Sequence, residues 1–186
     1  MSATDANKRL VILDRDGVIN KDSSEFVKSA EEWLPLPGSV AAIAALSAAG
    51  FFVAIASNQS GLARGLFDQD ALDAMHSKLK ALVEAEGGRV DHIAICPHGP
   101  DDDCNCRKPK PGLLMQIAQH FGLPLQGVAV VGDSERDLQA AVAVGARPIL
   151  VRTGNGKLTE QRLAAERGDI EVYDDLASAI ATLIKE

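Results

Sequence analysis

The sequence lacks long apolar runs and any excess of positive charge. Residues 1–9 are polar and only four apolar residues follow them, which is typical of neither a signal peptide nor a membrane span. Lysine and arginine number 19 against 26 aspartates and glutamates, so the net charge is -7. This charge disfavours nucleic acid as a partner, because contacts to phosphates supply most of that affinity. We therefore expect a cytoplasmic protein that binds neither membranes nor nucleic acid.

Cysteine and aromatic residues are also scarce. There are three cysteines, an odd number, and all lie within residues 96–106, which favours a shared metal ion over a disulfide framework. Aromatic residues make up 4% of the chain, too few to interleave with basic residues as a nucleic-acid surface requires. The chain has 186 residues, 46% of them apolar, and is long enough to fold around its own core. We expect a single domain over residues 1–186 and a monomer.

Short apolar runs alternate with helical patterns along the chain. The runs predict buried strands at residues 10–13, 51–56, 92–96, 128–131, 148–151 and 170–173. Helices are expected between them: from a cap at Ser39 to Gly50, from a cap at Asp68 to Gly87, over 111–121, after Gly132, from Thr159, and over 176–185. Such alternation predicts an α/β fold with a three-layer, doubly wound and mainly parallel sheet.

Polar side chains follow three of the predicted strands. Asp14 and Asp16 come after the first strand, Ser57 follows the second, and Asp133 follows the fourth. In a doubly wound sheet, ligands bind beyond the carboxyl ends of the strands, so we expect these side chains on one rim. Carboxylate oxygens suit Mg²⁺, and a carboxylate oxygen left free is a nucleophile for phosphoryl transfer.

The balance of charge on this rim predicts a role for Asp16. Ionised Asp14 and Asp133, together with a phosphate dianion, carry four negative charges. Mg²⁺, Lys108 and Arg107 balance them if Asp16 is protonated. A neutral Asp16 has a proton to give to the leaving oxygen, so we expect it to act as the general acid.

Four motifs on the rim resemble the signature of the haloacid dehalogenase (HAD) superfamily of phosphohydrolases. They read Asp14-Arg-Asp-Gly-Val18, Ser57-Asn-Gln-Ser60, Lys108-Pro109 and Gly132-Asp-Ser-Glu-Arg-Asp137. The resemblance implies a Rossmann-like fold and a single phosphohydrolase domain. It makes Asp14 the nucleophile and Asp16 the acid and then the base, with Ser57 and Lys108 binding phosphate. It also implies Mg²⁺ held by Asp14, Asp133 and the backbone carbonyl of Asp16.

Many members of this superfamily carry a cap domain over the site. Only 36 residues separate Asp14 from Phe51, and residues 57–108 already hold a helix, a strand and the cysteine loop. We therefore expect no cap domain and an open site.

The cysteines and one histidine predict a zinc-binding loop at about residues 96–106. Cys96, His98, Cys104 and Cys106 are ligands of the kind that Zn²⁺ prefers, and four protein ligands mark a structural site. Arg107 and the lysine after it follow directly, so the metal would hold both cations against the phosphate. The other histidines lie on helix or strand patterns, where surface or packing roles are expected: His76, His92 and His120.

The zinc loop narrows the resemblance to one branch. With the motifs after the first two strands, it is similar to the D,D-heptose 1,7-bisphosphate 7-phosphatases, which make a sugar precursor of the lipopolysaccharide inner core. The implied substrate is a sugar phosphate, and the implied contacts are Asp22, Ser57, Asn58, Gln59, Ser60, Arg107 and Lys108. Ser134 departs from the lysine that some members carry near the second phosphate.

Alternatives stay open at this point. Histidinol-phosphate phosphatases carry a similar zinc loop, although Arg107 would repel the amine of that substrate. A signalling receiver module also combines a phospho-accepting aspartate with Mg²⁺, but its acceptor follows the third strand, where this chain has Cys96. A zinc-knuckle nucleic-acid binder would use the basic residues 107–110, against which the net charge argues.

Overall fold

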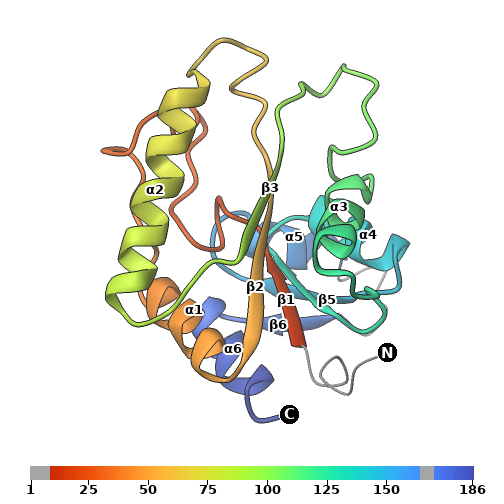
Figure 1. Cartoon of the computed structure of the whole chain (residues 1–186). Helices are drawn as coiled ribbons and strands as arrows, with labels where there is room; N and C mark the ends of the chain where they lie inside the picture. Colours follow the sequence, from red (N-terminus) through yellow and green to blue (C-terminus); the bar gives the residue numbers. More distant parts are fainter. Residues whose placement is uncertain (1–8, 164–169) are drawn as a thin grey trace.

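The computed structural model describes residues 9–163 and 170–186, which form a six-stranded parallel sheet with helices on both faces (Figure 1). The strand order is β3-β2-β1-β4-β5-β6. The strands are β1 (Arg9–Leu13), β2 (Phe51–Asn58), β3 (His92–Cys96), β4 (Ala129–Gly132), β5 (Arg147–Val151) and β6 (Glu171–Tyr173). The chain moves outward from β1 in one direction and from β4 in the other. This order confirms the predicted doubly wound α/β fold and leaves the switch point between β1 and β4.

The helices form the outer two layers. One face of the sheet packs against α1 (Ser39–Ala48), α2 (Gln69–Ala85) and α6 (Leu176–Leu183), and the other against α3 (Gly112–Phe121) and α4 (Glu135–Ala143). α5 (Gly156–Leu163) follows β5. Between β1 and α1 the chain runs through a loop at residues 14–38, as expected for a protein without a cap domain.

The central strand shows why two apolar layers form. Val11 and Leu13 point into the core beneath α1 and α2, whereas Leu10 and Ile12 point into the core beneath α3 and α4. Successive side chains of a strand alternate between faces, so a continuous apolar run buries both sides at once. β1 is therefore fixed between two cores, and the residues that follow it are held on a rigid support.

Two helix starts differ from the sequence-based prediction in an instructive way. Asp68 does cap α2, where its carboxylate accepts a hydrogen bond from the Ala71 amide at 2.9 Å. Ser39, however, is the first residue of α1 and not its cap, because its hydroxyl donates to the Ile19 carbonyl at 2.7 Å. α5 begins before Thr159, whose hydroxyl donates to the backbone carbonyl of Asp133 at 2.8 Å. Both hydroxyls fasten a helix to the loops beyond the strands.

The loops after β1 and β4 approach each other closely at Gly17. This residue has a φ of 84°, and a Cβ placed on it would collide with the carboxylate of Asp133. Only glycine satisfies both requirements without strain. The motif that follows β1 is thereby held directly against the end of β4.

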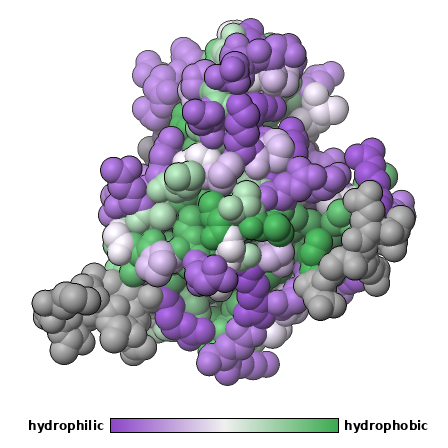
Figure 2. Space-filling model, turned by 90° about the vertical axis from the view of Figure 1, so that its right-hand side faces the viewer, coloured by the Kyte–Doolittle hydropathy of each residue, from purple (hydrophilic) through white to green (hydrophobic). Residues whose placement is uncertain are grey.

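The molecule has a polar end and an apolar middle. Seen from the side of α3 and α4, apolar residues form a band across the middle, and the loops beyond the carboxyl ends of the strands are mostly hydrophilic (Figure 2). Across the described ranges, no helix combines the length and the apolar character needed to cross a membrane.

Candidate active site

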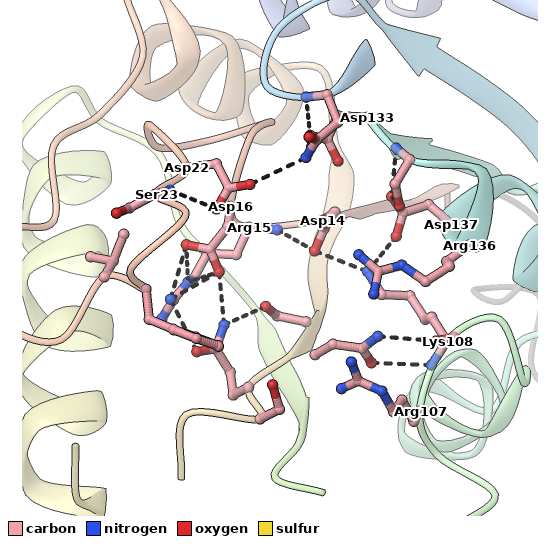
Figure 3. Close-up of a pocket in the computed structure, with 18 of the residues that line it drawn as sticks. Asp14, Arg15, Asp16, Asp22, Ser23, Arg107, Lys108, Asp133, Arg136 and Asp137 are labelled. Carbon is pink, nitrogen blue, oxygen red and sulfur yellow. Dashed lines mark hydrogen bonds and ion pairs between the residues drawn. The ribbon is translucent and has the colours of Figure 1, made fainter. Parts of the chain in front are cut away.

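Side chains from the carboxyl ends of β1, β2 and β4 and from the loop before α3 line one pocket of about 270 Å³ (Figure 3). It contains the predicted residues of the rim: Asp14, Asp16, Asp22, Ser57, Asn58, Gln59, Ser60, Arg107, Lys108 and Asp133. Further residues that line it were not among the predicted site residues, although four of them lie within the quoted motifs: Arg15, Phe26, Arg64, Ser134, Arg136, Asp137 and Asn155, among others. The four motifs therefore meet at one place.

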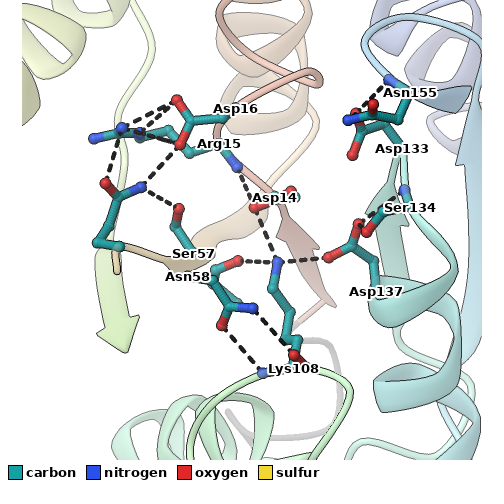
Figure 4. A network of polar contacts seen from close by, with 12 residues as sticks. Asp14, Arg15, Asp16, Ser57, Asn58, Lys108, Asp133, Ser134, Asp137 and Asn155 are labelled. Atoms are coloured by element: carbon teal, nitrogen blue, oxygen red, sulfur yellow. Dashed lines mark hydrogen bonds and ion pairs between the residues drawn. The ribbon is translucent and has the colours of Figure 1, made fainter. Parts of the chain in front are cut away.

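Lys108 lies at the centre of the pocket (Figure 4). Its Nζ is 2.9 Å from Asp14 Oδ1 and 2.6 Å from Asp137 Oδ1, and it donates to the Ala56 carbonyl at 2.7 Å. The side chain is only 4% exposed. Burial alone would lower the pKa of Lys108, but the carboxylates of Asp137 and Asp14 raise it above its ordinary value. The ammonium group is therefore charged at neutral pH.

Three carboxylates gather beside this lysine, two of which pair with it. Oxygens of Asp14, Asp133 and Asp137 lie within 4.8 Å of one another. Burial raises the pKa of Asp14 well above its usual range, opposed by Lys108 and reinforced by the other two carboxylates. Burial also raises the pKa of Asp133, to about 6. One lysine cannot balance the negative charge of three carboxylates. The carboxylate oxygens are hard ligands, which fit Mg²⁺.

Asp137 belongs to this cluster, although the sequence analysis placed it only in the fourth motif and gave it no role. It is the third residue of α4, where its carboxylate accepts hydrogen bonds from the amide and the hydroxyl of Ser134 at 3.0 and 2.6 Å. This reciprocal cap fixes the carboxylate at the start of the helix. The spacing of Ser134 and Asp137 was a usable signal. It identifies a helix cap, however, and does not show that the second carboxylate oxygen faces Lys108.

Asp133 is held by a residue that no motif pointed to. The backbone and side-chain amides of Asn155 donate to Asp133 Oδ2 at 2.7 and 3.2 Å. The same side-chain amide donates to Asp22 Oδ2 at 3.2 Å. Asn155 thus orients the Asp133 carboxylate and joins the loops that follow β1 and β5.

The carboxylate of Asp16 points away from this cluster toward Arg15. The Nη2 of Arg15 lies 3.0 Å from both Asp16 oxygens, and the amides of Asn20 and Gln59 each donate to the carboxylate at 2.8 Å. Burial tends to raise the pKa of Asp16, but Arg15 and these hydrogen bonds lower it overall. The free protein therefore holds Asp16 ionised. The protonated state that the charge balance gives concerns the site with a phosphate dianion and Mg²⁺ bound, and it stays a prediction.

Two amides of the Ser57–Ser60 motif are engaged within the protein. The side chain of Asn58 bonds to both the backbone amide and the carbonyl of Lys108, each at 3.1 Å. Gln59 donates to Asp16 and also to the Ser57 hydroxyl, the latter at 2.7 Å. These contacts position Lys108 and Asp16 relative to β2. Their predicted contact with substrate stays a prediction.

The loop at residues 96–106 brings its predicted zinc ligands together. The Sγ of Cys96 lies 3.2 Å from that of Cys106 and 3.8 Å from that of Cys104. His98 Nδ1 lies 3.6 Å from Cys96 Sγ and 3.3 Å from Cys106 Sγ. Four soft ligands converging at such separations fit one tetrahedral Zn²⁺. Beside them, Arg107 donates to the His98 carbonyl at 3.1 Å, so the cations after the loop are tied to it.

His76 contacts Arg15, which lines the active-site pocket, although the helical pattern around His76 predicted a surface or packing role. Its Nε2 is 3.4 Å from Nη1 of Arg15. Burial and the Arg15 charge lower the pKa of His76 to about 4, so the ring is neutral near pH 7. The expectation holds better for His92 and His120, whose rings stack at 4.0 Å between β3 and α3.

Comparisons with known proteins agree with this geometry. A HAD-hydrolase-like family model matches residues 105–179, and a model described as polynucleotide kinase 3 phosphatase matches residues 9–140. A D-glycero-β-D-manno-heptose-1,7-bisphosphate 7-phosphatase of Pseudomonas putida is 56% identical over 176 residues, which cover 95% of this chain and 99% of that protein.

Solved structures give the same result. The D,D-heptose 1,7-bisphosphate phosphatase of Bordetella bronchiseptica, complexed with magnesium and phosphate, is 52% identical with a TM-score of 0.90, covering 95% of this chain and 98% of that one. The corresponding phosphatase of Burkholderia thailandensis is 42% identical with a TM-score of 0.72, covering 96% of this chain and 100% of that one. The chain belongs to the D-glycero-β-D-manno-heptose-1,7-bisphosphate 7-phosphatase family of the HAD superfamily.

Proposed function

We propose that this chain is a Mg²⁺-dependent phosphatase that removes the 7-phosphate of D-glycero-β-D-manno-heptose 1,7-bisphosphate. The observation that carries the proposal is the cluster of Asp14, Asp133 and Asp137 around Lys108, in a chain that is 56% identical to a phosphatase of that name. A buried nucleophilic carboxylate beside a fixed cation is the equipment for phosphoryl transfer.

Asp14 is the nucleophile in this proposal. Its Oδ1 accepts from the Arg15 amide at 2.8 Å and lies 2.9 Å from Lys108 Nζ, so the carboxylate is oriented by two donors. A carboxylate oxygen attacks phosphorus, the bond from phosphorus to the C7 oxygen breaks, and its electron pair stays on the sugar oxygen. An aspartyl-phosphate forms on Asp14. Water then attacks this phosphorus and releases inorganic phosphate, which restores the carboxylate.

Electrostatic repulsion sets the requirement for a metal. A carboxylate and a phosphate dianion about 4 Å apart repel by roughly 8 kcal/mol at an effective dielectric near 20. Asp14, Asp133 and Asp137 offer oxygens for Mg²⁺, and the backbone carbonyl of Asp16 stays an expected further ligand. When bound, Mg²⁺ supplies the positive charge that offsets this repulsion. Lys108, which stays charged, neutralises part of it from within the chain.

Asp16 serves as acid and then as base. Its pKa is low in the free protein, and the arrival of a phosphate dianion nearby raises it, because like charges disfavour the ionised form. A protonated Asp16 gives its proton to the C7 oxygen as that oxygen leaves. The resulting carboxylate takes a proton from the attacking water in the second step.

The rim beyond the carboxylates is suited to a second phosphate. Arg64, Arg107 and Arg136 line the pocket, and within residues 9–163 and 170–186 none of them forms an ion pair with a carboxylate. Lys108 and Arg15, in contrast, are already paired with carboxylates. Guanidinium groups that have no carboxylate partner match a distal phosphate, including at the edge where Ser134 replaces a lysine. Histidinol phosphate would instead bring its cationic amine to this rim.

The test is a comparison of kcat/KM for three substrates: the heptose bisphosphate, histidinol phosphate and a 3′-phosphorylated oligonucleotide. We expect the heptose bisphosphate to exceed each of the others at least tenfold, a difference of about 1.4 kcal/mol. Equal or reversed values would contradict the proposed substrate and leave the chemistry at Asp14 untouched. Arg107→Ala should reduce the preference for the bisphosphate more than Asp22→Ala does, since only Arg107 offers a cation.

A further inference from the structure

Arg15 is an unusual member of the pocket, because its charge is almost completely withdrawn from solvent. Its side chain is 1% exposed, and Nε and Nη2 together contact both oxygens of Asp16 at 3.0 to 3.3 Å. Nη2 also donates to Gln59 Oε1 at 3.2 Å. Two of the three guanidinium nitrogens therefore hold the acid and the amide beside it.

The third nitrogen of Arg15 faces His76. The Nη1 of Arg15 lies 3.4 Å from Nε2 of His76, which reaches it from α2. A guanidinium group only donates, so Nε2 must be the acceptor and the ring proton must be on Nδ1. We infer that His76 is a positioning residue of the phosphatase, which holds the Arg15 guanidinium so that Asp16 faces the leaving oxygen.

The charge state of His76 suits this role. Besides burial, the charges of Arg15 and Lys80 lower the pKa of His76, and those of Asp73 and Asp16 raise it. The result is a neutral ring near neutral pH. A neutral imidazole has the lone pair that Arg15 needs, and an imidazolium would have neither that lone pair nor the right charge.

Loss of the acceptor has a defined consequence. A buried guanidinium nitrogen without a partner is costly, so the group turns toward another acceptor or draws in water. Because the guanidinium is a planar fork, a rotation that satisfies Nη1 misaligns Nε and Nη2, which grip Asp16. The proton of Asp16 would then no longer lie in line with the leaving oxygen.

The inference rests on the proposed function, and its test uses two leaving groups. The sugar alkoxide released from the heptose bisphosphate needs a proton from the acid, whereas the p-nitrophenolate released from p-nitrophenyl phosphate is stable without one. For each substrate, kcat/KM covers the steps up to formation of the aspartyl-phosphate. The ratio of the two values is independent of the fraction of enzyme that is folded.

We expect His76→Leu to lower this ratio, heptose bisphosphate to p-nitrophenyl phosphate, by about tenfold or more. General acids contribute about 100- to 10,000-fold, so a misplaced acid loses part of that factor. His76→Gln, whose side chain retains an acceptor oxygen, should keep the ratio within about threefold of the wild type. His120→Leu, the same change at the end of α3, is the matched control and should leave the ratio unchanged.

A double-mutant cycle tests whether His76 acts through Arg15. Arg15→Lys should lower the ratio, and adding His76→Leu should lower it little further, because the group that His76 holds is already gone. An equal loss with both substrates, or no loss in His76→Leu, would overturn the inference. If the wild type itself fails to hydrolyse the heptose bisphosphate, the proposed function fails and not the role of His76.

Discussion

Two buried cations flank the reaction centre, and different parts of the chain hold them. Arg15 follows β1 directly, and its fork grips one carboxylate, that of Asp16. Lys108 comes from the loop before α3 and divides its ammonium between Asp14 and Asp137. The two side chains are 1% and 4% exposed, so burial does not distinguish them. They differ in geometry and in support.

The geometry suits each cation to a different task. A guanidinium offers donors in a fixed plane, which locks the orientation of one carboxylate. An ammonium offers three donors that rotate freely, so Lys108 can turn from a carboxylate to a phosphate oxygen and stay charged. We call Arg15 with Asp16 the Arg15 side of the pocket, and Lys108 with Asp14 and Asp137 the Lys108 side. The Arg15 side therefore orients the acid, and the Lys108 side responds to substrate.

The support differs as well. Arg15 rests on a strand between two apolar cores and on α2. Lys108 rests on the Asn58 amide and on the loop that carries Cys96, His98, Cys104 and Cys106. A metal ion bound by these four residues would stabilise a loop that has few apolar residues to bury.

The sharpest way to separate the two sides is a pair of isosteric substitutions. We expect Asp14→Asn and Asp16→Asn both to reduce turnover of the heptose bisphosphate, Asp14→Asn by at least about 1,000-fold because the nucleophile is lost. Their effects on the free energy of unfolding should differ. Asp14→Asn removes a carboxylate whose pKa is raised by burial and by its neighbours, so the free energy of unfolding is kept or increased.

Asp16→Asn should lower the free energy of unfolding, because it leaves the Arg15 guanidinium buried without its counterion. Breaking a buried pair in this way costs about 3 kcal/mol. Urea unfolding of the metal-free variants measures both changes. Equal destabilisation by the two substitutions would contradict the distinction between the two sides.

Removal of Mg²⁺ should affect only the Lys108 side. Dialysis into Mg²⁺-free buffer should lower turnover at least about 100-fold, and added Mg²⁺ should restore it, because three carboxylates then face one lysine. Bound Mg²⁺ also stabilises the fold, by about 2.7 kcal/mol at a concentration 100 times its dissociation constant. This stabilisation, measured as a rise in Tm, should disappear in Asp133→Asn and persist in Asp16→Asn. The zinc content should stay constant throughout.

The predicted zinc site of Cys96, His98, Cys104 and Cys106 can be disrupted without changing the carboxylate site. Cys104→Ser should lower the zinc content, turnover by about tenfold, and the free energy of unfolding by about 1 to 3 kcal/mol, because Lys108 loses its support. For a chain of this size that corresponds to a fall in Tm of about 2 to 12 °C. Asn105→Ser, the same replacement between two ligands, is the matched control. Wild-type protein purified without chelators and free of zinc would disprove the metal site.

The elements and the rim could be predicted because their signals are local. Short continuous apolar runs predicted the strands, and the predicted Asp68 cap and the predicted end at Phe121 coincide with real helix ends. Parallel strands then bring their carboxyl ends to one edge, so residues distant in sequence were predicted to meet. The zinc ligands were predictable for the same reason, since all of them lie within eleven residues of one loop.

The charge states could not be predicted, because they depend on where long side chains turn. Arg15 and Asp16 are neighbours in sequence, and the Arg15 guanidinium folds back on the Asp16 carboxylate. The other contacts of Arg15 come from residues 44 and 61 positions away, Gln59 and His76. Nothing in the helical pattern around His76 distinguishes its ring from a packing residue.

His76 therefore leads to the smallest and most specific prediction, which concerns the Arg15 side alone. The pKa of the ring is about 4 in the folded protein and near its ordinary value of 6.5 when unfolded. Between these values the unfolded chain binds more protons, so the free energy of unfolding falls as the pH drops through this window. From pH 7 to pH 6 this group should contribute a loss of about 0.5 to 1 kcal/mol.

His76→Gln removes that contribution, because glutamine accepts from Arg15 without titrating. In urea unfolding at the two pH values, the wild type should lose more stability than this variant, and Ser77→Gln on the same helix should behave as the wild type. Other groups, including Asp133, titrate in the same range and cancel in the difference between wild type and variant. Identical losses in wild type and His76→Gln would show that the ring is exposed to protonation in the folded protein. It could then not be the neutral acceptor that keeps the Arg15 side fixed while the Lys108 side exchanges its partners.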